Sequence, residues 1–311
     1  MAIFRKGILV LAFVCLAIKG YCMSLSGNPP EVDFGTINYL YGAAGFGKVT
    51  ISETGTPSTS DSGNLVSQSG GAAGTVTFSL NVADRFLALF GTKFSLTINT
   101  NTYTATESCG QVTISNVHST NGASTVEQST SGSSVSLPIG ASLTVDSFTG
   151  STSCTITKTF DSVMTGKLSG SASAGLKIRV TLVPNMAVEH NSSASLNFGR
   201  ICTVATQQTI TVAPNGNVSS TNLFCPHQGT GADAFTVTGN IGQSFSVSLP
   251  STVTITNGSD SLTVSNLTSS CSSNCTLTDH TYNFTVGGTL TVPANTPTGN
   301  YQGNYQVTIT Y

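Results

Sequence analysis

The chain has very little charge. Only 8% of its 311 residues are Asp, Glu, Lys or Arg, and the formal net charge is −2. A chain of this composition has no strong positive field overall, so its charge points neither to nucleic acid nor to an anionic membrane as a partner. Trp is absent, aromatic residues make up 7%, and there are only 10 prolines. Few charges and few prolines beside abundant Ser, Thr, Gly and Val indicate short strands joined by turns rather than disorder.

Long apolar runs are also missing, with one exception at the N-terminus. A basic pair, Arg5 and Lys6, precedes an apolar run over residues 7–18 that leads to Cys22. This pattern predicts a secretory signal peptide over residues 1–22, with cleavage near its end. No later stretch is long and apolar enough to span a bilayer as a helix. The mature protein is therefore expected outside the cytoplasm.

The cysteines fit an exported protein. The signal peptide removes Cys15 and Cys22, and six cysteines remain. An even number in an oxidising compartment favours disulfides, although six cysteines allow many connectivities. The histidines near them do not complete a tetrahedral zinc set, so neither a metal nor another cofactor is expected. The order of the cysteines and the repeat described below favour three pairs: Cys109–Cys154, Cys202–Cys225 and Cys271–Cys275.

The C-terminal stretch Gly299–Tyr311 shows strict alternation. Tyr301 and every second residue after it fall on one face of an extended chain, and polar side chains fall on the other. Successive strand side chains point to opposite faces, so this pattern predicts a half-buried strand. No later segment is expected to cover the neighbouring sheet edge, which leaves that edge open to a second polypeptide. The residues expected at this strand-accepting edge are Tyr305, Val307, Ile309 and Tyr311.

The rest of the chain repeats itself at domain scale. Six segments recur in the same order; examples are Val32–Ile37 with Leu196–Ile201, and Ile139–Val145 with Val286–Val292. Each copy is a series of short alternating strands separated by Gly, Ser and Asn turns. The predicted fold is therefore all-β, with two tandem immunoglobulin-like, pilin-like β-sandwich domains after the signal peptide.

The expected domain limits follow from the repeat and from one proline. Leu176, Ile178, Val180 and Leu182 share one face of the last strand of the first copy, which ends near Pro184. A proline cannot donate to a strand ladder and fits the start of a linker. The predicted organisation is a signal peptide at 1–22, a sandwich with insertions at 23–183, a linker at 184–194 and a second sandwich at 195–311.

The second copy resembles a known family. Its opening Leu196–Gly199, the run Val286–Ala294 and the closing Gly299–Gly303 are similar to a secreted bacterial family of unknown function (domain of unknown function 4402), which itself resembles the spore-coat-protein-U-like pilins of archaic chaperone–usher systems. The resemblance implies a sandwich that lacks its last strand, which a periplasmic chaperone and then another subunit supply by strand pairing. It also implies export through the periplasm to the cell surface. The mature N-terminus Ser24–Pro30 departs from the pattern because its prolines would break a donor strand, which fits a subunit at the end of a fibre.

Three classes of function remain to be compared. The favoured one is a secreted structural or adhesive protein, a tip-like subunit of a cell-surface fibre, and the alternative is a stand-alone secreted sandwich that binds a partner. An outer-membrane β-barrel is less favoured, because most alternating segments are shorter than a membrane strand. Catalysis is not expected. No nucleophile or metal spacing surrounds any of the four histidines, His118, His190, His227 and His280.

Two apolar segments of the first copy predict a surface-binding patch. Residues 39–46 follow the strand 32–37, and Phe86–Phe90 follow the strand 74–82, with a polar loop at 54–73 between them. If the strands alternate in direction, both segments emerge at one end and form a patch for a host or abiotic surface. The alternative is that Phe86–Phe90 folds back as a plug over the end of the sandwich. The predicted patch residues are Tyr39, Tyr41, Phe46, Phe86, Leu87, Leu89 and Phe90.

Overall fold

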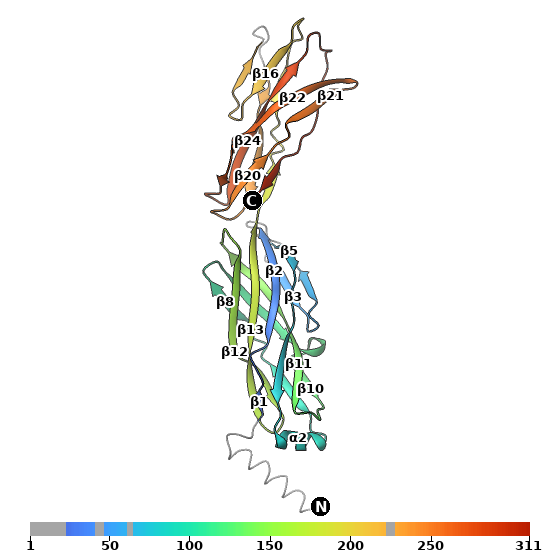
Figure 1. Ribbon diagram of the computed structural model, residues 1–311, viewed down its shortest axis with the longest axis vertical. Helices are drawn as coiled ribbons and strands as arrows, with labels where there is room; N and C mark the ends of the chain where they lie inside the picture. Colours follow the sequence, from blue (N-terminus) through green and yellow to red (C-terminus); the bar gives the residue numbers. More distant parts are fainter. Residues whose placement is uncertain (1–22, 41–46, 61–64, 222–227) are drawn as a thin grey trace, which may run out of the picture. The chain divides into compact units, whose positions relative to one another are not determined.

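The computed structural model describes residues 23–40, 47–60, 65–221 and 228–311. Strands dominate these residues (Figure 1), which confirms the predicted all-β class. The chain divides into two compact units, and the boundary lies between Pro184 and Asn185. We call them unit 1 and unit 2 and describe each by itself. Within the described residues, no helix is long and apolar enough to cross a membrane.

The described residues of unit 1 form two sheets and two short helices. Its elements are β1 (Ser24–Leu25), β2 (Glu31–Leu40), β3 (Lys48–Ile51), β4 (Pro57–Ser60), β5 (Leu65–Ser69), β6 (Gly74–Ser79), α2 (Val82–Leu89), β7 (Phe94–Ile98), β8 (Tyr103–Glu107), β9 (Gly110–His118), η1 (Thr120–Gly122), β10 (Thr125–Gln128), β11 (Ser134–Phe148), β12 (Cys154–Lys167) and β13 (Ser171–Asn185). One sheet has the order β1-β6-β11-β3-β4, with β9 paired to β11 and β8 to β9. The other has the order β10-β7-β12-β13-β2-β5.

Alternating side chains build the core between these two sheets. On β13, the four residues Leu176, Ile178, Val180 and Leu182 are all 0% exposed, and the residues between them are accessible to solvent. Across the sandwich, Phe78 of β6 contacts Phe94 of β7, with the ring centroids 5.5 Å apart. Burying each such side chain stabilises the fold by about 1.5–3 kcal/mol. The period-two pattern of the sequence therefore corresponds to the core of unit 1.

Unit 2 contains the second copy of the repeat. Its elements are β14 (Ala187–His190), β15 (Asn197–Phe198), β16 (Gln208–Val212), β17 (Val218–Ser220), β18 (Thr230–Gly231), β19 (Asp233–Thr238), β20 (Ser244–Ser248), β21 (Thr252–Asn257), β22 (Asp260–Ser269), β23 (Cys275–Thr276), β24 (Thr281–Val292) and β25 (Thr308–Thr310). The main sheet has the order β14-β19-β24-β16-β17, with β22 paired to β24 and β21 to β22. A three-stranded sheet has the order β23-β20-β25, and β15 pairs with β18.

The strand pairings of unit 1 recur in unit 2. The pairs β1–β6, β6–β11, β3–β11 and β9–β11 have the counterparts β14–β19, β19–β24, β16–β24 and β22–β24. The sequence repeat is thus also a repeat of sheet topology. One part of the expected linker at 184–194 differs, because residues 187–190 form β14 and pair with β19. This segment takes the place in unit 2 that β1 has in unit 1.

Disulfides are present in both units. Cys109 is bonded to Cys154 in unit 1, and Cys271 to Cys275 in unit 2. Both are pairings expected from the order of the cysteines. Cys202 is also disulfide-bonded. Its expected partner, Cys225, lies outside the described residues.

Candidate strand-acceptor site

The candidate site is the edge of unit 2 at β25. In unit 1, β12 has a partner on each side: Met164 pairs with Ile98 of β7 and with Ala174 of β13. In unit 2, Ile309 of β25 pairs with Val247 of β20, the counterpart of β7. The sheet order stops there, and within the described residues no strand pairs with the other side of β25. We call this unpaired edge, where unit 1 has β13, the strand slot.

Side chains beside the strand slot are less buried than their counterparts in unit 1. On β7, Leu96 is 0% and Ile98 is 3% exposed. At the matching positions in unit 2, Val247 and Leu249 are only partly buried, although they pack against the core. A sheet edge that offers both unpaired backbone groups and half-covered apolar side chains is suited to strand addition.

The predicted acceptor residues separate into two groups. Tyr305, Val307 and Ile309 all pack against the core of unit 2, and each is partly buried. The side chain of Tyr311 does not follow them: it is 57% exposed, and its hydroxyl donates a hydrogen bond to Oδ1 of Asn185, which lies on the unit 2 side of the boundary. Tyr311 therefore lies at the rim of the strand slot rather than on its core-facing side.

The terminal strand is also shorter than the alternation predicts. Only Thr308–Thr310 form a strand, and further back Gln302 makes an isolated bridge to Thr256 of β21. A regular ladder needs a partner for every backbone N–H and C=O group. One side of this segment is unpaired. Residues 303–307 therefore keep the alternation of exposed and partly buried side chains but form no continuous ladder of backbone hydrogen bonds.

A buried carboxylate connects three segments next to the strand slot. Asp233, at the start of β19, is 5% exposed. Its Oδ1 lies 2.7 Å from Nε2 of His190 on β14, and its Oδ2 accepts a hydrogen bond of 2.7 Å from the hydroxyl of Tyr305. Burial, followed by the hydrogen bond to Asp233 and its charge, raises the pKa of Tyr305. Asp233 was not singled out from the sequence, although it shares the inward-facing phase of β19 with Phe235.

The raised pKa predicts that unit 2 loses stability in alkali. The phenol ionises less readily in the folded than in the unfolded chain, so this contribution is complete below the unfolded pKa of about 10 and declines as the pH rises above it. Tyr305→Phe should cost about 1.5–3 kcal/mol at neutral pH, because it removes a hydrogen bond to a charged group. It should also flatten the decline above pH 10. Calorimetric melting of both proteins across this pH range provides the measurement, and equal alkaline slopes would contradict the prediction.

The second half of the chain can now be placed among known proteins. Residues 187–311 match the family described as Domain of unknown function (DUF4402). The match covers the described strands of unit 2 and none of unit 1, so the resemblance expected for the second copy is confirmed. The chain matches no curated protein.

Solved structures with a similar arrangement include two chaperone complexes. The CsuC–CsuE chaperone–tip adhesion subunit pre-assembly complex, from archaic chaperone–usher Csu pili of Acinetobacter baumannii, is 10% identical, with a TM-score of 0.40 over 93% of this chain and 100% of that chain. A chaperone–tip adhesin complex of CFA/I fimbriae biogenesis is 12% identical, with a TM-score of 0.24 over 91% and 97%.

Outside the matched residues 187–311, the apolar patch predicted for unit 1 is not one patch. Tyr39 is 4% exposed, and its ring contacts Phe148, the last residue of β11. The helix α2 lies beside the first residues of β11, where the N–H of Leu80 donates to the carbonyl of Ser133. Because β11 has 15 residues that each rise about 3.3 Å, its two ends are about 45 Å apart. Figure 1 shows α2 at one end of unit 1. Tyr41 and Phe46 lie outside the described residues.

The error comes from the segment 54–73, which was expected to be a loop. It contains two strands, β4 and β5. β3 and β6 run in the same direction, since both pair antiparallel with β11. β4 reverses along β3, but β5 leads on into β6 without a further reversal, because Ala72 beyond β5 still bridges Asp33 in the antiparallel sense in which β5 pairs with β2. The chain therefore reverses twice between β3 and β6 instead of once, and Tyr39 and α2 lie at opposite ends of unit 1.

Proposed function

We propose that the protein is an exported, tip-like subunit of a cell-surface fibre, whose unit 2 accepts a strand from another chain at the strand slot. The observation that supports this most is the comparison of the two units. The same sheet continues from β12 to β13 in unit 1 and stops at β25 in unit 2. A chaperone in the periplasm, and then a neighbouring subunit, would supply the strand.

The position at the end of a fibre is supported by the residues that follow the expected signal peptide. Met23 is 4% exposed in the core of unit 1, and Ser24 and Leu25 pair with Ser79 and Phe78 of β6. These residues are engaged in their own sheet, so they are not free to complete another subunit. A subunit that accepts a strand without donating these residues would terminate a fibre.

The complementing strand should have the side-chain pattern of β13. In unit 1, Ala174 and Leu176 follow each other at alternate positions and are almost completely buried beside β12. Thr310 pairs with Ser246 as Lys167 pairs with Ser95, which places Tyr311 where unit 1 has Leu168. An apolar residue at every second position, without proline, is therefore what the strand slot would select.

This correspondence gives a direct test of strand acceptance. The sequence Ser169–Leu182 is appended after Tyr311, so that the chain can turn back as unit 1 does and fill its own strand slot. We expect the melting transition of unit 2 to rise, by at least about 2 kcal/mol of stability, because several apolar side chains become buried. Hydrogen exchange of the β25 amides should slow at the same time.

The matched control is the same extension with the positions of Leu176, Ile178 and Val180 changed to Ser. It should add length without stability. If the apolar and the serine extensions leave unit 2 equally stable, strand acceptance is wrong. The stand-alone binding sandwich then becomes the better interpretation.

A further inference from the structure

The helix α2 is an addition that the fold does not require. In unit 1 it joins β6 to β7, whereas in unit 2 the equivalent strands β19 and β20 are joined by the turn Gly239–Gln243. Both connections span the same two sheets, so a short turn is sufficient. The helix therefore needs an explanation other than chain connection.

The large apolar side chains of α2 face the solvent and a polar one faces the protein, which is the opposite of a helix that packs against a core. Its single buried residue is Asp84, at 0% exposure. Val82 is 73%, Phe86 36% and Leu89 77% exposed, and Phe90, just after the helix, is 58% exposed. A surface helix normally turns its apolar stripe to the core. We call Val82, Phe86, Leu89 and Phe90 the α2 face.

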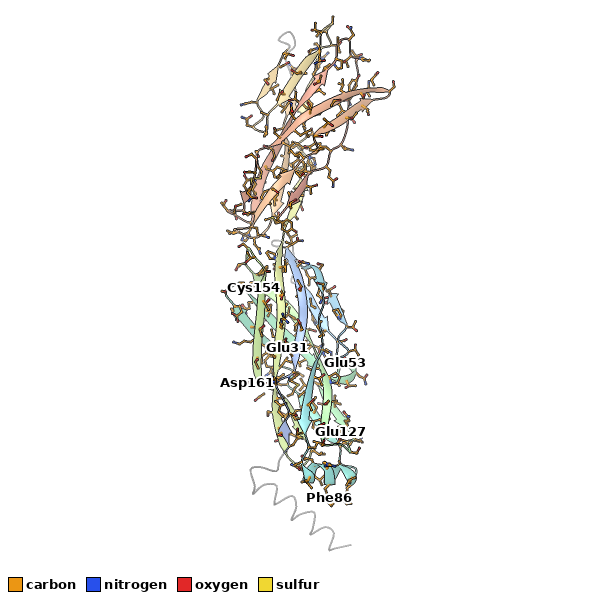
Figure 2. All side chains as sticks on the ribbon, viewed as in Figure 1. Glu31, Glu53, Phe86, Glu127, Cys154 and Asp161 are labelled. Carbon is orange, nitrogen blue, oxygen red and sulfur yellow. A yellow bond between two sulfur atoms is a disulfide. The ribbon has the colours of Figure 1, made fainter. Side chains whose placement is uncertain are left out.

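Contacts with the sheet fix this orientation. The carboxylate of Asp84 accepts hydrogen bonds from the N–H of Asn81 and from the N–H of Ser169, each of 3.0 Å, and a further one from the hydroxyl of Ser169. The side chain of Asn81 accepts the N–H of Asp84 in return, which completes a capping box. Ser169 belongs to the turn between β12 and β13. The α2 face thus points away from the strands because the helix is anchored, and Figure 2 places Phe86 at this end of unit 1.

The aromatic side chains of the α2 face form a continuous surface. The rings of Phe86 and Phe90 contact each other with centroids 4.9 Å apart. Exposed apolar surface of this kind is uncommon on soluble proteins unless it binds something. The exposures also contradict the plug interpretation of Phe86–Phe90.

Basic side chains accompany the α2 face. Arg85 on the helix, Lys93 just before β7 and Lys167 at the end of β12 are all exposed. Two carboxylates lie at the same end: Glu127 is exposed and pairs with Ser95, as Lys167 does from the other side, whereas Asp84 is buried. The formal net charge of −2 for the whole chain conceals this local excess of cations. Phenylalanine and leucine beside Lys and Arg on a short helix are the combination that binds the interface of anionic lipid bilayers.

We propose that the α2 face binds the surface of a lipid bilayer that carries anionic headgroups. Phe86, Leu89 and Phe90 would enter the headgroup region, and Arg85, Lys93 and Lys167 would face the lipid phosphates. The helix lies at one end of unit 1 with this face turned outward, which fits a bilayer, whereas a protein partner would have to bring its own groove. The proposal gives the proposed tip-like subunit an adhesive role and does not depend on strand acceptance.

The absence of tryptophan makes a clean reporter available. In the mature chain, Leu89→Trp introduces a single indole at the most exposed position of the α2 face. We expect its fluorescence to shift to the blue with phosphatidylcholine vesicles that contain phosphatidylglycerol, and much less with phosphatidylcholine alone. The shift should weaken as salt is added, because headgroup attraction is screened. No shift with either vesicle would overturn the proposal.

Co-sedimentation with the same vesicles assigns the contribution of each group. Phe86→Ser with Phe90→Ser should reduce binding at least tenfold, and Lys93→Gln with Lys167→Gln should remove the preference for anionic vesicles. Val218→Ser, an exposed apolar residue of unit 2, is the matched control and should bind like the parent. If the Phe variant lowers the melting temperature of unit 1, Val82→Ser with Leu89→Ser replaces it, because both side chains are more exposed.

Two outcomes would refute the bilayer as the partner. One is parent-like vesicle binding by the α2 variants. The other is binding to bare polystyrene without binding to any vesicle, which would indicate generic adsorption. Neither outcome alters the stability of unit 2 with its appended strand, so the two proposals fail independently.

Discussion

Deleting Val307–Tyr311 is expected to unfold unit 2 and to leave unit 1 folded. The deletion removes two side chains, Val307 and Ile309, that pack against the core of unit 2. It also removes the strand Thr308–Thr310, and with it the partner of Ser246–Ser248 on β20. Each lost apolar side chain contributes up to about 1.5–3 kcal/mol, and the exposed edge of β20 adds to the loss. The total stability of a domain is typically about 5–15 kcal/mol. Because β25 belongs to a sheet of three strands, unit 2 should not stay folded after these losses.

Calorimetry of the mature chain should then show one melting transition in place of two. Unit 1 keeps its transition because its own β13 completes its sheet. Thr308→Ser is the control: its side chain is exposed, and the backbone pairing with Ser248 is kept, so the change should be within about 0.5 kcal/mol. A truncated protein that retains the second transition would show that β25 is not part of the folding unit.

The sequence predicts most of the architecture because strands that bury one face carry a period of two. Leu176, Ile178, Val180 and Leu182 were assigned to one face, and all four are buried in the core. The pattern does not reveal α2, whose apolar residues face outward. A local signal for the helix was nevertheless present in Asn81 and Asp84, which have the spacing of a capping box.

The parts of the candidate site that were missed depend on contacts between distant residues. Tyr305 was expected to face the core on the basis of its phase, but its partner Asp233 is 72 positions away. No local pattern encodes that distance. In the same way, the position of Tyr39 relative to Phe86 depends on how many times the chain reverses between them. One additional reversal, where β4 returns along β3 before β5 leads on into β6, was enough to invert the expected arrangement.

Replacing Gly287 by Ala is expected to destabilise unit 2 by at least about 3 kcal/mol, at the upper end of what overpacking costs. Gly287 lies in β24, where the neighbouring strand β16 ends. An added Cβ would overlap the carbonyl oxygen of Val212 and lie 2.7 Å from the carbonyl carbon of Ala213 and 2.8 Å from the nitrogen of Pro214. All three are backbone atoms, so no side chain can rotate out of the way. The strand itself has to move, and its pairing with β24 is disturbed.

The repeat supplies a second copy of the same test. Gly140 of β11 matches Gly287, and its added Cβ would overlap the carbonyl oxygen of Ile51 at the end of β3. Gly140→Ala should therefore lower the melting transition of unit 1 and not that of unit 2, while Gly287→Ala should do the opposite. Gly231→Ala is the control, because the nearest atom to its added Cβ is 3.7 Å away. If Gly287→Ala melts like the parent while Gly231→Ala does not, the close approach of the two strands has been misassigned, and with it the structural equivalence of the two units.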